Sequence, residues 1–445
     1  MAALKKYLPI LLFLLIPLYP KFPLVGVGGT FVSVRLEDLL LAGVFVVYLI
    51  SLGRRPLEKL NNPMFRAIFL YWFIGFAASF SGIFLTKTAT VSLGLLHTLR
   101  RVEYMCLFLI AYNWLSGLDQ LKYYLRVFLL IGVIVAVYGL GQQFLHFPVI
   151  STTNSEFSKG LALTLGAGAR INSTFAGHYD LAAFCVFPLL LIISLLSLSK
   201  NRLLLLTAGG LIYWTMLLSA SRITFASFFL SAAVLIVIIR KKLWLVPLVA
   251  ISFLGFLLSP QLRGRYLDLI TNHLLSLAPP VSAQTLTPLP AAPVTATATA
   301  ESKAVDAVPD ALKPPAVAED RSFNIRLKVE WPRALRAFIK NPLFGSGYSS
   351  VGLAVDNEYL RILAETGLLG LAGFCLIILR FFLSGLPWLR HYQPNIKSAF
   401  IASSSCFLLS LLLGGLFIDV FAASKIAMML WSIIGLAEKT KTLSA

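Results

Sequence analysis

Charged residues are scarce in this chain: 13% of its 445 residues are Asp, Glu, Lys or Arg, whereas 58% are hydrophobic. A soluble domain carries about 25% charged residues, so the composition excludes a soluble protein and predicts a polytopic membrane protein. Acidic residues are scarcer than basic ones, which gives a net charge of +19. No basic stripe interleaved with aromatic residues occurs in a polar segment, so nucleic acid is not an expected partner.

Cysteine and histidine are also rare, with four and five copies. Every cysteine falls in an apolar run, so a disulfide framework in an external loop is not expected. The histidines are scattered without the spacing of metal ligands, and we predict no metal site and no cofactor. The residues concerned are Cys106, Cys185, Cys375, Cys406, His97, His146, His178, His273 and His391.

Long apolar runs make up most of the chain. A run of about 20 apolar residues spans the hydrocarbon core of a bilayer as a helix, and we expect about twelve such helices in an all-α integral membrane protein. The first run follows Lys5 and Lys6 as in a signal peptide, but prolines occupy the place of a cleavage site, so we interpret it as the first span. The runs are centred near Leu14, Gly43, Phe73, Phe108, Val133, Pro188, Ile212, Phe229, Ile251, Phe374, Leu409 and Met429.

The distribution of Lys and Arg predicts the orientation. With twelve spans, the chain ends and short loops on one side of the membrane hold more Lys and Arg than the short loops on the other side. The side with more Lys and Arg is cytoplasmic by the positive-inside rule. Both termini are therefore expected in the cytoplasm. The protein would be a multi-pass membrane protein in this orientation.

One long polar segment, 260–357, interrupts the apolar runs between the ninth and tenth predicted helices, on the predicted external side. It separates helices 1–9 (1–259) from helices 10–12 (358–445). Its middle, Ser276 to Asp320, is rich in Pro, Ala and Thr and lacks aromatic residues, so it cannot bury enough surface to fold and is predicted to be disordered.

The rest of the loop is predicted to be structured. Residues 321–351 regain aromatic and aliphatic side chains and contain six basic residues against one acid, Glu330. Pro332 is expected to start or kink a helix with Leu335, Phe338 and Ile339 on one face. The segment NPLFGSGY, from Asn341, is then predicted to be a turn.

Two arginines at predicted external boundaries are candidate ligands of a phosphate. Arg222 in SASR starts a helix, and Arg170 lies in a glycine-rich loop close to His178 and Asp180. A guanidinium can bind phosphate through two parallel hydrogen bonds. An alternative interpretation is that these side chains anchor on lipid headgroups.

Several segments resemble the O-antigen ligase and polymerase superfamily of bacterial envelope glycosyltransferases. They are VRLEDLLL, RINSTFAGHYDLAAF, SASR, NIRLKVEWPRAL, NPLFGSGY and DNEYLRILAETGLLG. The resemblance implies transfer of a glycan from undecaprenyl diphosphate at the outer face of the bacterial inner membrane, without a metal or a nucleotide sugar. Expected partners are this lipid-linked donor, a glycan, lipid or protein acceptor, and membrane lipids.

The resemblance also implies roles for individual residues. Arg222 and Arg326 correspond to arginines that hold the lipid diphosphate, with Arg170 as a third candidate. Asp356 stands where ligases of the family have a histidine, next to Asn357, and these two are the predicted catalytic residues. The departure from histidine argues against lipopolysaccharide ligation in particular, and a polymerase or a transferase to another acceptor fits equally.

The segment VDNEYLRILAETGLLGLAGF, 355–374, has charged residues at the start of a predicted membrane helix. We interpret Glu358, Arg361 and Glu365 as a solvated first turn with spaced charge pairs. Gly367 and Gly370 are expected to let the helix pack closely on a neighbour. Asp356 is expected to be an ionised but weak base, since an aspartate in water has a pKa of about 3.9.

The sequence thus predicts a ligase-type or polymerase-type glycosyltransferase. A transporter of a glycan or small anion is the main alternative, although no convincing internal repeat is present. An inactive scaffold of the same fold is a third possibility. The sequence does not identify the acceptor or the sugar.

Overall fold

The computed structural model describes residues 2–19, 23–26, 33–52, 62–149, 165, 169–260, 263–264, 267, 325–352 and 355–443. The predicted disordered segment, Ser276 to Asp320, and the first residues of the basic segment lie outside the described residues.

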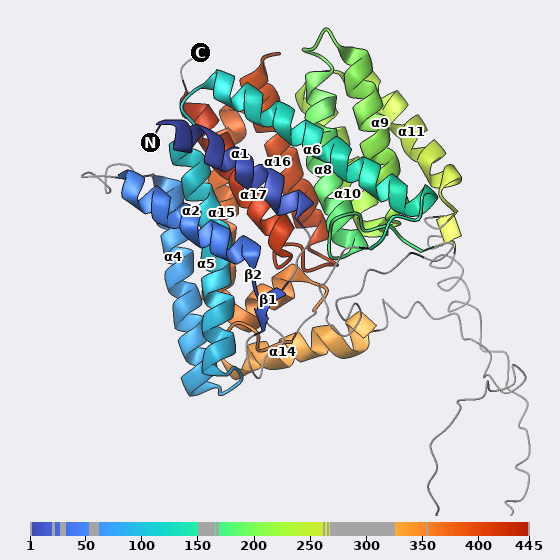
Figure 1. Ribbon diagram of the computed structural model, residues 1–445. Helices are drawn as coiled ribbons and strands as arrows, with labels where there is room; N and C mark the ends of the chain where they lie inside the picture. The colour runs from blue at the N-terminus through green and yellow to red at the C-terminus, as the bar shows by residue number, and fades with distance from the viewer. Residues whose placement is uncertain are drawn as a thin grey trace, which may run out of the picture.

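The described chain is almost entirely helical (Figure 1). Each of the twelve predicted centres lies in a helix, because long apolar runs satisfy their backbone groups internally only as helices. The α-helices are α1 (Ala2–Leu18), α2 (Leu36–Leu52), α4 (Pro63–Phe80), α5 (Val91–Trp114), α6 (Leu118–Phe144), α8 (His178–Leu195), α9 (Arg202–Leu218), α10 (Arg222–Ile238), α11 (Leu245–Leu258), α14 (Trp331–Lys340), α15 (Glu358–Arg390), α16 (Ile396–Gly414) and α17 (Ser424–Thr442).

Shorter elements lie between these helices. The strands β1 (Pro23–Gly26) and β2 (Ser33–Arg35) form an antiparallel pair between α1 and α2. A π-helical turn, η1 (Ser81–Leu85), ends α4, and another, η4 (Arg326–Glu330), leads into α14. A 3₁₀ turn, η2 (Lys242–Trp244), precedes α11.

The described helices include five that are long and apolar enough to cross a membrane. Four shorter apolar helices accompany them. The all-α membrane class is therefore confirmed, whereas the count of twelve spans and the external position of the long loop stay predictions. The five are Pro63–Leu85, Leu118–Phe144, His178–Leu195, Glu358–Arg390 and Ile396–Gly414.

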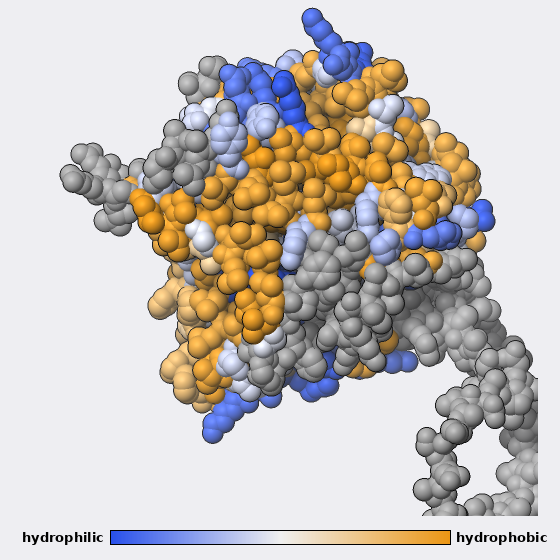
Figure 2. Space-filling view, in the orientation of Figure 1, coloured by the Kyte–Doolittle hydropathy of each residue, from blue (hydrophilic) through white to orange (hydrophobic). Residues whose placement is uncertain are grey.

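The hydrophobic core lies between packed helices. α17 packs along α5, α15 packs along α4, and α16 packs between α8 and α10. The outer surface is also apolar, and Figure 2 shows hydrophilic residues mostly along two opposite edges of it. α1 begins and α17 ends at the same end of the bundle, and α14 lies across the other end (Figure 1).

The predicted helix around Pro332 and the turn after it are confirmed. Pro332 is in the first turn of α14, where its missing N–H costs nothing. Residues 341–350 form successive turns, and Gly345 and Gly347 have positive φ angles of 75° and 86°.

This turn is inserted into a break in α15. Gly367 has φ 66° inside the helix, and a Cβ there would lie 2.3 Å from the carbonyl oxygen of Leu343. The chain therefore needs glycine for conformation and for space. The N–H groups of Leu368 and Leu369 donate to the carbonyls of Pro342 (2.9 Å) and Leu343 (3.3 Å) instead of to their own helix.

Candidate functional site

Asp356 and Asn357 lie directly before α15 and are held by another part of the chain. Asn357 caps the helix: its Oδ1 accepts from the N–H of Leu360 (2.9 Å), and its Nδ2 donates to the carbonyl of Leu416 (3.0 Å). The residue is 9% exposed. The structure thus gives Asn357 a capping role, and a catalytic role for it stays a prediction.

Asp419, between α16 and α17, anchors the backbone around Asp356. Its carboxylate accepts from the N–H groups of Val355 (2.9 Å), Asp356 (3.2 Å) and Asn357 (3.2 Å). Asp356 has φ 52°, in the left-handed region that non-glycine residues rarely adopt. The three bonds hold this conformation, so Asp419 determines where the Asp356 side chain points.

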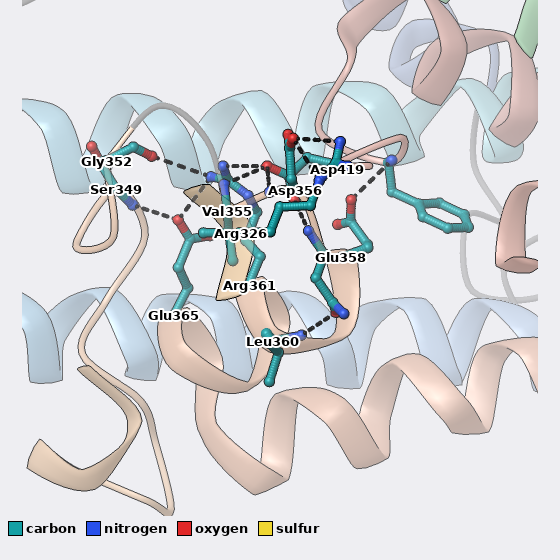
Figure 3. A network of polar contacts seen from close by, with 12 residues as sticks. Arg326, Ser349, Gly352, Val355, Asp356, Glu358, Leu360, Arg361, Glu365 and Asp419 are labelled. Atoms are coloured by element: carbon teal, nitrogen blue, oxygen red, sulfur yellow. Dashed lines mark hydrogen bonds and ion pairs between the residues drawn. The ribbon is translucent and has the colours of Figure 1, made fainter. Parts of the chain in front are cut away.

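Arg326 binds one oxygen of the Asp356 carboxylate. Its Nε and Nη2 lie 3.0 and 2.8 Å from Oδ2 (Figure 3). The arginine side chain is 8% exposed and that of Asp356 is 32% exposed. Oδ1 has no hydrogen-bond partner in the described part of the chain. The pair therefore fixes Asp356 and leaves one carboxylate oxygen for a substrate.

Burial raises the pKa of Asp356 above its ordinary value, and the charge of Arg326 offsets only part of this effect. The carboxylate is therefore a stronger base than the ordinary aspartate that we expected from the sequence. Asp419 behaves differently. Burial opposes its ionisation, but Arg361 and the backbone N–H groups hold its pKa below the ordinary value.

A second carboxyl group, Glu330, lies beside the pair at the end of η4. Its Oε2 is buried and has no hydrogen-bond partner among the residues that the structure describes. Burial and then the charge of Asp356 raise its pKa. A buried oxygen without a donor is costly, so this position suits the hydroxyl group of a bound molecule. The sequence analysis noted Glu330 only as the single acid of a basic segment.

The charged first turns of α15 are buried, so their interpretation as a solvated turn is wrong. Glu358, Arg361 and Glu365 are 1%, 6% and 3% exposed. Arg361 bridges Glu365 (3.3 Å) and Asp419 (2.7 Å). The spacing of charges along a helix does not reveal whether distant segments cover it, and here the loop around Asp419 does.

The other carboxylates of this turn also bind backbone groups. Glu358 accepts from the N–H of Phe421 (3.0 Å), and Glu365 accepts from that of Ser349 (3.1 Å). Arg101 of α5 donates to the carbonyl of Phe421 (2.7 Å). The network thus joins α5, α15, the turn after α14 and the α16–α17 loop, as Figure 3 shows for part of it. Its interlocking charges make the site rigid.

Arg170 and Arg222 form a separate basic pair. Arg170 Nη1 lies 2.8 Å from His178 Nε2. Burial, and then the charge of Arg222, lower the pKa of Arg170, so the two cations interact electrostatically. Both are partly exposed. Two neighbouring cations favour a polyvalent anion, which fits the predicted role in binding a diphosphate.

The Arg326–Asp356 pair and the Arg170–Arg222 pair lie around the same end of α16. α10 and α16 are antiparallel, since Arg240 at the end of α10 bonds to the carbonyl of Arg390 before α16. Ser410 donates to Ser227 (3.0 Å). Arg222 lies five residues, or about 7.5 Å, beyond Ser227, which places it level with the end of α16, where Leu416 bonds to Asn357.

Within the described ranges, no three His, Cys, Asp or Glu side chains come together in a group that could hold a metal ion. The site consists instead of carboxylates and arginines. Asp419, Glu330 and Arg101 are polar residues of the site that the sequence analysis missed. A lone Asp in the apolar stretch Leu416–Phe421 was the available signal for Asp419.

Fold and site together define a polytopic membrane protein with a buried polar site at one end of its helical bundle. Residues 203–375 match the model of the O-antigen ligase family, which confirms the resemblance to the O-antigen ligase and polymerase superfamily. The matched segment contains Arg222, Arg326, Asp356 and Asn357, and it leaves out Arg170 and Asp419. No curated protein matches the chain.

Proposed function

We propose that this protein transfers a glycan from undecaprenyl diphosphate to a hydroxyl acceptor at the outer face of the inner membrane. The family supports a ligase-type or polymerase-type membrane glycosyltransferase. The observation that carries the proposal is the carboxylate of Asp356, which has one oxygen clamped by Arg326 and the other open to a substrate.

In this mechanism Asp356 Oδ1 takes the proton of the acceptor hydroxyl while the hydroxyl oxygen attacks the anomeric carbon. The new glycosidic bond forms as the bond from the anomeric carbon to the diphosphate breaks, and its electron pair leaves with the diphosphate. Arg170 and Arg222 stabilise the growing negative charge. No metal or cofactor is needed for this proton balance.

Arg326 serves the same step in a different way from the one that the family resemblance implied. Its Nε and Nη2 hold Asp356, whereas Nη1 has no partner in the described part of the chain. Arg326 can therefore orient the base and still donate through Nη1 to a phosphate oxygen. Its role as a diphosphate ligand stays part of the proposal.

Deletion of the gene, followed by analysis of the lipid-linked glycans, tests the proposal. Loss of a polymerase leaves single repeat units on the carrier lipid, whereas loss of a ligase leaves long chains on it. A copy carrying Asp356→Asn, expressed at the normal level, is expected to leave the same accumulation as the deletion. Unchanged lipid-linked glycans in the deletion strain would instead support transport or inactivity.

A further inference from the structure

The position of α14 marks it as an element at the membrane boundary. Asn341, directly after α14, donates to Ser81 Oγ (2.7 Å), and Ser81 donates to the carbonyl of Gly345 (2.9 Å). Ser81 starts η1, the last turn of the apolar span Pro63–Leu85. Since that span ends where the hydrocarbon ends, α14 lies at this level, across the long helices (Figure 1).

α14 packs on the rest of the protein through two small side chains, with Trp331 at its start packed beside them. Ala334 and Ala337 are buried against Val351, Val355 and Ala364. Two large apolar residues are directed elsewhere: Leu335 and Ile339, one turn apart, are 45% and 71% exposed. Leaving such side chains in water forfeits about 25 cal/mol per Å² of apolar surface. This face therefore requires an apolar environment.

The basic residues of α14 lie on a third face. Arg333, Arg336 and Lys340 are exposed, and at 3.6 residues per turn they form a strip on one side of the helix. Leu335 and Ile339 form the neighbouring strip. A helix with an apolar strip beside a basic one lies in the plane of a membrane interface, with the cations at anionic headgroups.

We propose that η4 and α14 form an interfacial anchor that seats on the anionic surface of the leaflet. Leu335 and Ile339 insert below the headgroups, and Arg336 and Lys340 bind lipid phosphates. Arg326, which holds Asp356, belongs to η4, and η4 continues directly into α14. The anchor therefore keeps Arg326 aligned with Asp356, so that binding of anionic lipid promotes catalysis. Only this last step rests on the proposed function.

Depth measurements on the full chain in phosphatidylglycerol vesicles test the anchor. Cys375 is the exposed cysteine and the other three are buried, so a Cys375→Ser background accepts one nitroxide label at Ile339→Cys or Arg333→Cys. The Ile339 label is expected to be accessible to oxygen and shielded from a nickel chelate, and the Arg333 label the reverse. Equal nickel accessibility at both sites would overturn the anchor and leave the apolar face to a protein partner.

Glycan transfer measured in vesicles with and without phosphatidylglycerol tests the link to catalysis. The double variant Arg336→Gln/Lys340→Gln is expected to lose the stimulation by anionic lipid, by roughly fivefold for each charge removed. The matched control is Lys241→Gln/Lys242→Gln, which removes two exposed charges beyond the opposite end of α10. It should keep the stimulation.

Equal stimulation in the two double variants would overturn the link between lipid and catalysis. If none of the proteins transfers glycan in either vesicle, the proposed function fails, and the depth measurement still decides whether α14 is an anchor. The two failures are thus distinguishable.

Discussion

At the scale of single residues, Asp356 is the side chain on which the chemistry is expected to depend. Asn in its place keeps the shape and can still accept from Arg326, but it cannot take a proton. Asp356→Asn is therefore expected to lower the transfer rate by a factor of about 10² to 10⁴, with donor binding retained. Asp356→His should recover part of the rate. Initial rates and donor binding on purified protein measure both.

The pH profile provides a second check on this residue. Because the pKa of Asp356 is raised, the transfer rate should fall on the acid side at a higher pH than it would for an ordinary aspartate. Activity should be lost as the pH drops through the pKa of Asp356, because the base becomes protonated. Near-normal turnover of Asp356→Asn, with an unchanged profile, would show that Asp356 only holds Arg326 in place and is not the base.

Asp419 is predicted to act through position and not through chemistry. Asp419→Asn removes the charge opposite the buried Arg361, and breaking a buried ion pair costs about 3–5 kcal/mol. We expect a lower unfolding temperature in detergent and a reduced kcat with little change in donor KM. The pKa of Asp419 is depressed in the folded protein, so its stabilising contribution should be lost as pH falls through that pKa. A variant with normal stability and kcat would remove Asp419 from the positioning role.

Arg222 and Arg326 are predicted to require the guanidinium fork. A lysine carries the same charge but cannot form two parallel hydrogen bonds, so Arg222→Lys and Arg326→Lys should each lose most of the activity. Anchoring on lipid headgroups would tolerate lysine at either site. Transfer rates separate the two interpretations, and full activity in both variants would contradict a role in the site.

At the scale of secondary-structure elements, the break in α15 is what allows the turn after α14 to reach the site. Gly367→Ala adds a Cβ that would overlap the carbonyl of Leu343, at φ 66°. Such strain costs about 1–3 kcal/mol, and displacement of the turn should also lower activity. Thermal unfolding and transfer rates measure the two effects.

Gly210→Ala in α9 is the matched control, since nothing lies within 4 Å of the Cβ that it adds. This variant is expected to be as stable as the parent, because alanine favours a helix. A Gly367→Ala protein that unfolds at the same temperature as the control would show that the break is not required.

At the scale of the whole molecule, the segment Ser276 to Asp320 is predicted to be a dispensable tether. Closing a loop costs only about 0.6 kcal/mol more for each doubling of its length, so removal of most of this segment should leave transfer largely intact. The assay compares the deletion with the full chain at equal membrane level. Complete inactivity of a deletion protein that still folds and inserts would identify a binding element there.

The sequence by itself determined the membrane class, the positions of the helices and the turn at NPLFGSGY. These features depend on local patterns: apolar runs longer than a bilayer is thick, and Pro and Gly at fixed places. The segments around Arg222, Arg326 and Asp356 were also recognisable as family motifs, and the family match covers all three.

Only the tertiary structure decided which charges are buried and which groups they bind. Glu358, Arg361 and Glu365 have the spacing of a solvated helix turn, yet they are buried. The loop around Asp419 contacts Glu358 and Arg361, and the turn after α14 contacts Glu365. Likewise, Arg326 and Asp356 form a pair across thirty residues of chain. Partners so far apart leave no local periodicity, and the energy of a charge depends on its surroundings, which exist only once the helices have packed.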